Sequence, residues 1–175
     1  EAKVATFHEL ALLAQPTDVG KKILDEQIMA LTAEQIGKEF ADDPRTEATL
    51  REALGRVYYH PLALFEQAEA HQKRVVVLRR EILGDEHPDT LRSIGTLGTI
   101  LRVRGKLDLA VPLLREALQG ARHTLGDEHP GTLASINNLG TVLLDLGRLD
   151  EAEPLMHEVV ELGARTLGEV NGTTL

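Results

Sequence analysis

The sequence lacks cysteine and tryptophan, and aromatic residues make up only 3% of its 175 residues. Without cysteine the chain has no disulfide framework and no thiolate chemistry, as is typical of proteins of a reducing compartment. It also has no apolar run of the roughly 18 residues that a membrane span needs. The charged start, EAKVATFHEL, lacks the basic and apolar regions of a signal peptide, so we expect a cytoplasmic location.

Positive charge is also scarce, because 28 acidic residues outweigh 19 Lys and Arg and give a net charge of −9. Diffuse binding to nucleic acids or anionic membranes is therefore excluded as a property of the whole chain. The first residue is Glu1 rather than Met, so we expect a fragment of a longer protein.

A repeat with a period of 42 residues is present in the second half of the chain. The stretch LGDEHPDTL at 83–91 recurs as LGDEHPGTL at 125–133, with eight of nine residues identical. The segments 96–114 and 138–156 align at the same spacing. A fixed period of this length indicates a repeat architecture.

Two further copies are incomplete. The boundary begins again at Leu167 and then decays, and an earlier unit starting near Thr49 needs one extra residue close to His60 and Pro61. These matches predict the following organisation: an N-terminal segment at 1–43, three repeats at about 44–85, 86–127 and 128–169, and the truncated start of a further helix before residue 175.

Each repeat is predicted to form two helices. In the third repeat, apolar residues recur at helical spacing over 133–146 and again over 149–159. Gly147 between them favours the end of the first helix. Pro112 and Pro154 are expected near the first turn of each second helix, where a missing N–H costs least. No stretch alternates with period two, so the predicted fold class is all-α.

This pattern resembles the tetratricopeptide repeat. The Leu-Gly pairs at 97–98 and 139–140 match its small-residue positions, and the period with the LG-x-x-HP-x-TL boundary is similar to the kinesin-light-chain type over 44–175. The resemblance implies a right-handed superhelical array of antiparallel helix pairs. The first repeat departs from the pattern, because Gln72 stands where an apolar residue is usual and Pro61 lengthens a turn.

The repeated Asp-Glu-His of the boundary has two interpretations. Gly84 and Gly126 suit the end of a helix, and Pro88 and Pro130 suit the first position of the next, so the stretch can be a turn between helices. Asp, Glu and His are also metal ligands, but adjacent residues of a tight turn point apart and a metal needs converging groups. We favour the turn.

The first 43 residues are predicted to form a helical cap over the first repeat, with helices at 4–15 and 19–40. The phrase EFADDPRTEATLREALG at 39–55 is similar to the region between the kinase domain and the repeats of some bacterial serine/threonine kinases, notably planctomycete ones. The chain itself contains no glycine-rich loop, HRD or DFG motif.

No set of residues in the sequence has the spacing of a catalytic or metal site. The seven histidines include no HExxH pair, and Ser93 and Ser135 lack a nucleophile elbow. We therefore expect a protein that is not an enzyme and that uses no metal or cofactor.

Stacked helix pairs present a concave face lined by the first helix of each pair. Placing the sequence on the tetratricopeptide register predicts ten groove residues. Asn and Thr can bond to a peptide backbone, Arg can bind a carboxylate, and Tyr can supply an apolar anchor. The resemblance implies that the paired asparagines contact a bound peptide. The ten candidates are Glu52, Arg56, Tyr59, Arg92, Thr96, Thr99, Arg102, Asn137, Asn138 and Thr141.

Two functions remain open at this point. The first is a protein-interaction module that captures a peptide of a partner protein in the groove, with a preference for acidic residues or a free carboxylate. The second is a structural spacer or assembly module that self-associates through an apolar patch on the last repeat. The residues expected in that patch are Leu155, Met156, Val159, Leu162 and Leu167.

Overall fold

The computed structural model describes residues 30–60 and 62–172, with side chains over 33–60 and 62–165. These residues form seven helices and no strand, which confirms the all-α prediction. The predicted helix at 4–15 lies outside the described residues, as does the first half of the one at 19–40, and α3 lies within its second half. The helices are α3 (Ala30–Glu39), α4 (Pro44–Tyr59), α5 (Phe65–Leu83), α6 (Pro88–Val103), α7 (Leu107–Leu125), α8 (Pro130–Asp145) and α9 (Leu149–Gly172).

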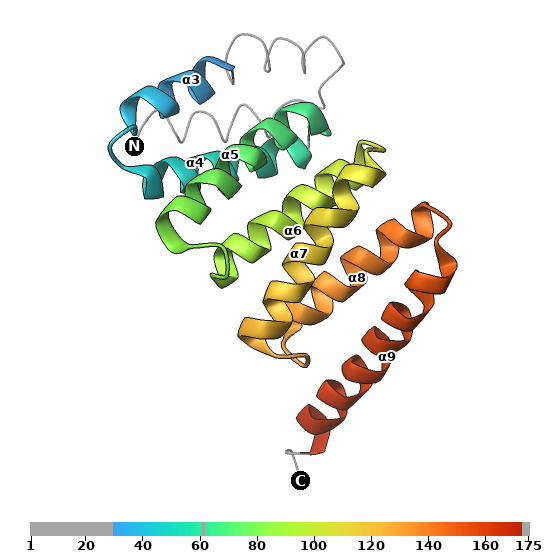
Figure 1. Ribbon diagram of the computed structural model, residues 1–175. Helices are drawn as coiled ribbons and strands as arrows, with labels where there is room; N and C mark the ends of the chain where they lie inside the picture. Colours follow the sequence, from blue (N-terminus) through green and yellow to red (C-terminus); the bar gives the residue numbers. More distant parts are fainter. Residues whose placement is uncertain (1–29, 61, 173–175) are drawn as a thin grey trace.

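The helices form three consecutive pairs, α4–α5, α6–α7 and α8–α9, which we call the first, second and third repeats. Each pair packs on the next, so the array extends from α3 at one end to α9 at the other (Figure 1). The first helices of the second and third repeats, α6 and α8, also contact each other directly. None of the helices in the described part of the chain is both long and apolar enough to cross a bilayer.

The boundaries between repeats are formed by local chemistry that the sequence predicts. Gly84 and Gly126 follow α5 and α7 with φ of 88° and 85°, values that disfavour residues with a side chain. Pro88 and Pro130 then occupy the first position of α6 and α8. The Asp-Glu-His stretch is therefore a turn between helices.

The histidine of each boundary has a role that the sequence does not predict. His87 and His129 are the N-cap residues of α6 and α8. The Nδ1 atom of His87 accepts the backbone N–H of Asp89 at 3.1 Å, and that of His129 accepts the N–H of Gly131 at 3.0 Å. The two imidazoles thus satisfy N–H groups that have no partner within their helices.

Small residues allow the two helices of a repeat to approach closely. A Cβ added at Gly98 in α6 would lie 2.6 Å from two carbons of Leu114 in α7, and one at Gly140 in α8 would lie 1.9 Å from the Cε of Met156 in α9. A side chain at either position would force its neighbour to shift, and at Gly98 the neighbour is a branched leucine that is buried in the core, in agreement with the tetratricopeptide register.

The apolar core extends through the second and third repeats. One cluster runs from Val76 in α5 to Leu162 in α9, whereas a separate, smaller cluster around Tyr58 lies mainly in the first repeat and includes Ile100 of α6. Buried polar side chains follow the opposite distribution. Among the described residues, every buried side chain that can ionise lies in the first repeat, as does the one buried glutamine. These residues are Glu47, Glu69, His71, Gln72 and Arg79.

Two expectations about the second helices differ from the structure. Pro112 and Pro154 are the sixth residues of α7 and α9, so they lie in the second turn rather than near the first. The boundary expected at Leu167 is not present, because α9 continues through Gly168 to Gly172. The third copy of the boundary lacks the His-Pro pair that caps and starts the next helix in the other two copies.

The turn between α4 and α5 contains the extra residue that the sequence predicts. Gly55 takes the place of Gly98 in the packing of the repeat, and the two are 43 rather than 42 residues apart. Ala63 in this turn has a φ of 55°, in the left-handed region that favours glycine. The longer turn thus includes a strained residue.

Candidate functional site

A groove runs along the first helices of the three repeats. It has a volume of about 920 Å³, and its lining residues come mainly from α4, α6 and α8, with contributions from α5 and α7. We call it the inner groove. Its lining combines apolar residues, among them Leu91, Ile100, Ala121 and Leu125, with polar ones.

Seven of the ten predicted groove residues line this one groove. They come from all three repeats and are Glu52, Arg56, Tyr59, Arg92, Thr96, Thr99 and Asn138. The register therefore brings residues that are up to 86 positions apart in the sequence to one surface.

The other three predicted residues do not line the inner groove. Asn137 is exposed, because neighbouring residues of a helix are rotated by about 100° from each other and Asn138 is the one that faces the groove. Thr141 lies on α8 beyond the end of the groove and donates its hydroxyl to the backbone oxygen of Asn137 at 2.7 Å. Arg102 forms an ion pair with Asp145 at 2.8 Å through one nitrogen of its guanidinium.

The α4 side of the groove combines an aromatic ring with a positive charge. The ring of Tyr59 packs edge-on against Phe65, with centroids 5.4 Å apart, and against His60 at 4.4 Å. Arg56 lies one turn before Tyr59 and is exposed, and no acidic side chain in the described part of the chain pairs with it. This end therefore offers a fixed ring beside an available guanidinium.

The acidic groups of the groove already have partners. Glu52 receives two hydrogen bonds from the guanidinium of Arg79, at 2.8 and 3.3 Å. Arg79 is buried and also donates to the hydroxyl of Ser93 in α6. Asp89 forms an ion pair with Arg92 at 3.0 Å. Because both carboxylates are paired, Arg56 is the cation with the most freedom to bind an anionic group.

The hydroxyl and amide groups differ in what they can offer a ligand. Thr96 and Thr99 donate their hydroxyl protons to the backbone oxygens of Arg92 and Gly95, at 3.0 and 3.1 Å. Their oxygens therefore remain available as acceptors. The amide of Asn138 is half-buried and has no hydrogen-bond partner among the described residues, so it can both donate and accept.

The sequence reasoning missed part of the groove at the start of α8. His129, Gly131, Ala134 and Ser135 line it there. Ala134 stands 42 residues after Arg92, a predicted groove residue that does line the groove, so the repeat register contains the signal for this position. Gln72 of α5, which departs from the apolar pattern of the repeat, also lines the groove.

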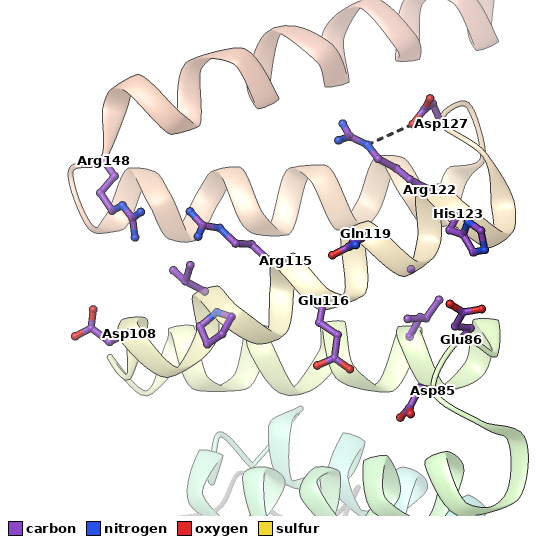
Figure 2. A pocket seen from close by; sticks show the side chains of 14 residues that line it. Asp85, Glu86, Asp108, Arg115, Glu116, Gln119, Arg122, His123, Asp127 and Arg148 are labelled. Carbon is purple, nitrogen blue, oxygen red and sulfur yellow. Dashed lines mark ion pairs between the residues drawn. The ribbon is translucent and has the colours of Figure 1, made fainter.

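A second cavity, of about 1060 Å³, lies along the outside of α7 (Figure 2). Its charges are largely used in ion pairs between successive repeats. Arg115 pairs with Glu151 and Arg122 with Glu158, both at 2.5 Å, and Arg122 also reaches Asp127 at 3.3 Å.

The same arrangement occurs one repeat earlier, where Arg80 pairs with Glu116 and with Asp85. Both signs of charge alternate on this surface, and its cations already have partners. We therefore take the inner groove, rather than the outer face, as the candidate site. In the described part of the chain, no group of three or more His, Asp or Glu could hold a metal ion.

The apolar patch predicted on the last repeat has a different composition from the one expected. Leu162 is buried, with 5% of its surface exposed, and Leu155 and Val159 pack against the core. Val160 is instead 70% exposed, although its equivalent in the second repeat, Leu118, is only 5% exposed. Leu167 lies beyond the described side chains. The expected exposure is therefore wrong for Leu162, because the helices of an end repeat still bury one side against each other, whereas Leu155, Met156 and Val159 are half-buried.

Comparison with known proteins identifies the repeat type. A family model described as Tetratricopeptide repeat matches residues 45–119 and 95–165. No curated protein matches the sequence.

Three crystal structures share the fold. The first is a Podosopora anserina kinesin light chain candidate, whose own TPR-like repeats are nearly identical to one another. Its sequence is 24% identical to that of this chain, and the TM-score is 0.62 over 84% of this chain and 73% of that one. A variant of that protein has a sequence identity of 22% and a TM-score of 0.63, over 89% of this chain and 80% of that one. BtubC (BKLC) from P. vanneervenii has a sequence identity of 16% and a TM-score of 0.65, over 92% of this chain and 67% of that one.

Proposed function

The chain belongs to the tetratricopeptide-repeat family, whose members generally mediate protein–protein interactions, and from this premise we propose that it binds a peptide segment of a partner protein in the inner groove. The observation that carries the proposal is the continuity of the groove across α4, α6 and α8. A surface built from three repeats can contact several residues of one extended segment. The module acts by binding and not by catalysis.

The polar groups of the groove favour a segment with an acidic residue or a free carboxylate. Arg56 has no acidic partner in the described part of the chain, and it lies one turn from the ring of Tyr59. A carboxylate bound by Arg56 with an apolar neighbour against Tyr59 would use both groups. Asn138, on the opposite side of the groove, can bond to the N–H and C=O of the peptide backbone.

Arg102 does not line the inner groove, and one nitrogen of its guanidinium pairs with Asp145. The preference for acidic ligands now depends mainly on Arg56.

A peptide-display selection on the whole chain tests this function. Enriched peptides are then measured by fluorescence anisotropy against Arg56→Glu and Asn138→Ala, with Asn137→Ala as the matched control outside the groove. We expect acidic peptides, a loss of about tenfold or more in affinity with either groove variant, and no change with the control. Enrichment of basic peptides, or equal losses at Asn137 and Asn138, would contradict the proposal.

A second candidate function is self-assembly through the open face of α9. It is supported by Val160, which is 70% exposed where the equivalent Leu118 is 5% exposed. Burial of such a side chain against a second copy would contribute favourably to association. Sedimentation of the chain over a range of concentrations tests it, with Val160→Glu as the disruptive variant and Val77→Glu, at another exposed apolar residue, as the control. A strictly monomeric chain at all concentrations would leave peptide binding as the function.

The wider setting follows from the same proposal. The module would serve a larger multidomain signalling protein of the cytoplasm, and the resemblance of residues 39–55 to kinase-linked repeats suggests a kinase domain as its neighbour.

A further inference from the structure

The packing between the first and second repeats differs from the packing that follows it. Six positions are buried both in α5 and, 42 residues later, in α7. Three of the six are apolar in both helices. At the other three, α5 has Glu69, Gln72 and Arg79, whereas α7 has Val111, Leu114 and Ala121.

Each of the three polar side chains bonds to the second repeat. Gln72 donates to the backbone oxygen of Ser93 at 2.9 Å. Arg79 donates to the hydroxyl of Ser93 and to the backbone oxygen of Asp89, the latter at 3.4 Å. Together with the bonds of Glu69, described next, they form what we call the polar joint.

Glu69 supplies the charged part of the polar joint. Its carboxylate is 4% exposed and pairs with Lys106, at 3.0 Å, and with Arg104, both in the turn between α6 and α7. Lys73 of its own helix adds a third cation at 2.7 Å. The polar joint is thus formed by hydrogen bonds and ion pairs that span α5 and the second repeat.

The second and third repeats are joined differently. Val111 and Leu114 belong to the apolar cluster that continues through α6 to α9. Of α5, only Val76 belongs to this cluster, and the cluster around Tyr58 includes a single residue of the second repeat, Ile100. Separating apolar side chains exposes their whole buried area to water. Separated polar groups recover hydrogen bonds from water, so their bonds across a joint contribute only a small net stability.

We propose that the polar joint is the point at which the array opens, so that the first repeat separates and unfolds as a unit while the second and third repeats stay folded. This proposal does not depend on the proposed function. It has a consequence for the groove, because Glu52, Arg56 and Tyr59 all lie on α4 and leave with the first repeat. Opening of the joint therefore removes one side of the inner groove.

The chain contains a natural probe for this opening. Its two tyrosines, Tyr58 and Tyr59, both lie in α4, and it has no tryptophan. Tyrosine fluorescence therefore reports on the first repeat, whereas circular dichroism at 222 nm reports on all helices. Urea unfolding followed by both signals is expected to give a lower midpoint for fluorescence, because non-coincident transitions indicate a partly folded state. Coincident transitions would overturn the proposal.

Replacing Gln72 by leucine distinguishes a weak joint from simple fraying at a chain end. The variant introduces the residue that α7 has at the equivalent position, Leu114. We expect the equilibrium constant for opening of the first repeat to fall about tenfold, so that the two midpoints move together. Gln119→Leu, at an exposed glutamine of α7, is the matched control and should leave the midpoints apart. An unchanged separation in Gln72→Leu would show that end position, and not the polar joint, controls the opening.

The reciprocal change tests the apolar joint. Leu114→Gln places an amide opposite Ser135, the equivalent of Ser93, and should allow α8 and α9 to exchange their amide hydrogens faster than α6. Hydrogen exchange with mass spectrometry measures this directly. Uniform acceleration over α6 to α9 would count against the importance of this position.

Discussion

Replacing His71 by leucine is expected to abolish most of the loss of stability that the first repeat undergoes when the pH falls from neutral to 5. His71 is a residue of α5 with 5% of its surface exposed, and its ring stacks on Tyr58 of α4 with centroids 5.3 Å apart. Its Nδ1 atom has no hydrogen-bond partner among the described residues. A charged imidazolium would be poorly solvated in this position.

The magnitude follows from the pKa of this residue. Burial, with a smaller contribution from the positive charge of Arg51, lowers the pKa of His71 from 6.5 to about 4. Between these values the unfolded chain binds a proton that the folded chain does not, so a falling pH favours unfolding. The cost is about 1.4 kcal/mol per pH unit, or about 2 kcal/mol from pH 6.5 to pH 5.

Urea unfolding monitored by tyrosine fluorescence at pH 7 and pH 5 is the assay. The wild-type chain should lose about 2 kcal/mol more than His71→Leu between the two pH values. Leucine is a suitable replacement because Leu113 occupies the equivalent position in the second repeat. His123→Leu, at an exposed histidine of α7, is the control and should behave like the wild type. An equal loss in the wild type and in His71→Leu would refute the reasoning.

Three further predictions concern other parts of the array. Burial disfavours the charged form of Glu69, but hydrogen bonds from Lys73, Lys106 and Arg104 outweigh this effect and lower its pKa to about 2. The stability that the charged carboxylate contributes is present above pH 4.5 and is lost as the pH falls toward 2. In an acid titration followed by tyrosine fluorescence, Glu69→Gln should therefore show a smaller change over that pH range than the wild type. Gly98→Ala should lower the unfolding free energy by about 1–3 kcal/mol in urea titrations, because its Cβ meets Leu114 at 2.6 Å, whereas Gly163→Ala, where a Cβ meets nothing within 4 Å, should not destabilise the chain. His129→Ala should cost about 1 kcal/mol by removing the cap of α8, and His129→Asn should retain most of it in the same titration.

The repeat boundaries could be predicted because their chemistry is local. A glycine with positive φ and a proline at the first helical position depend on a few neighbouring residues, so Gly126 and Pro130 indicate a turn without any knowledge of packing. The capping by His129 was missed because histidine is not among the usual N-cap residues. Here the acceptor is a ring nitrogen, which the sequence pattern does not distinguish from a surface imidazole.

The position of a side chain in the candidate site could be predicted where it follows from the helix register. It could not be predicted where it depends on a contact with a residue far away in the sequence. The register places Arg92, Thr96 and Asn138 on one face, and they do line the inner groove. It cannot show that Arg102 pairs with Asp145, because that contact depends on how α6 and α8 lie side by side. Likewise, Gln72 is visible as an anomaly in the sequence, but its acceptor, the backbone oxygen of Ser93, is defined only by the packing of α5 on α6.

The ion pairs on the outer face make the 42-residue unit suitable for duplication. Arg80 and Arg122 each bind a glutamate that lies 36 residues further along the chain. Residues 88–129 contain both Glu116 and Arg122, so a chain in which this segment is inserted a second time would recreate the same pair at each new boundary. The length of the array could therefore be increased by whole units, with the spacing between arginine and glutamate keeping the added repeats in register.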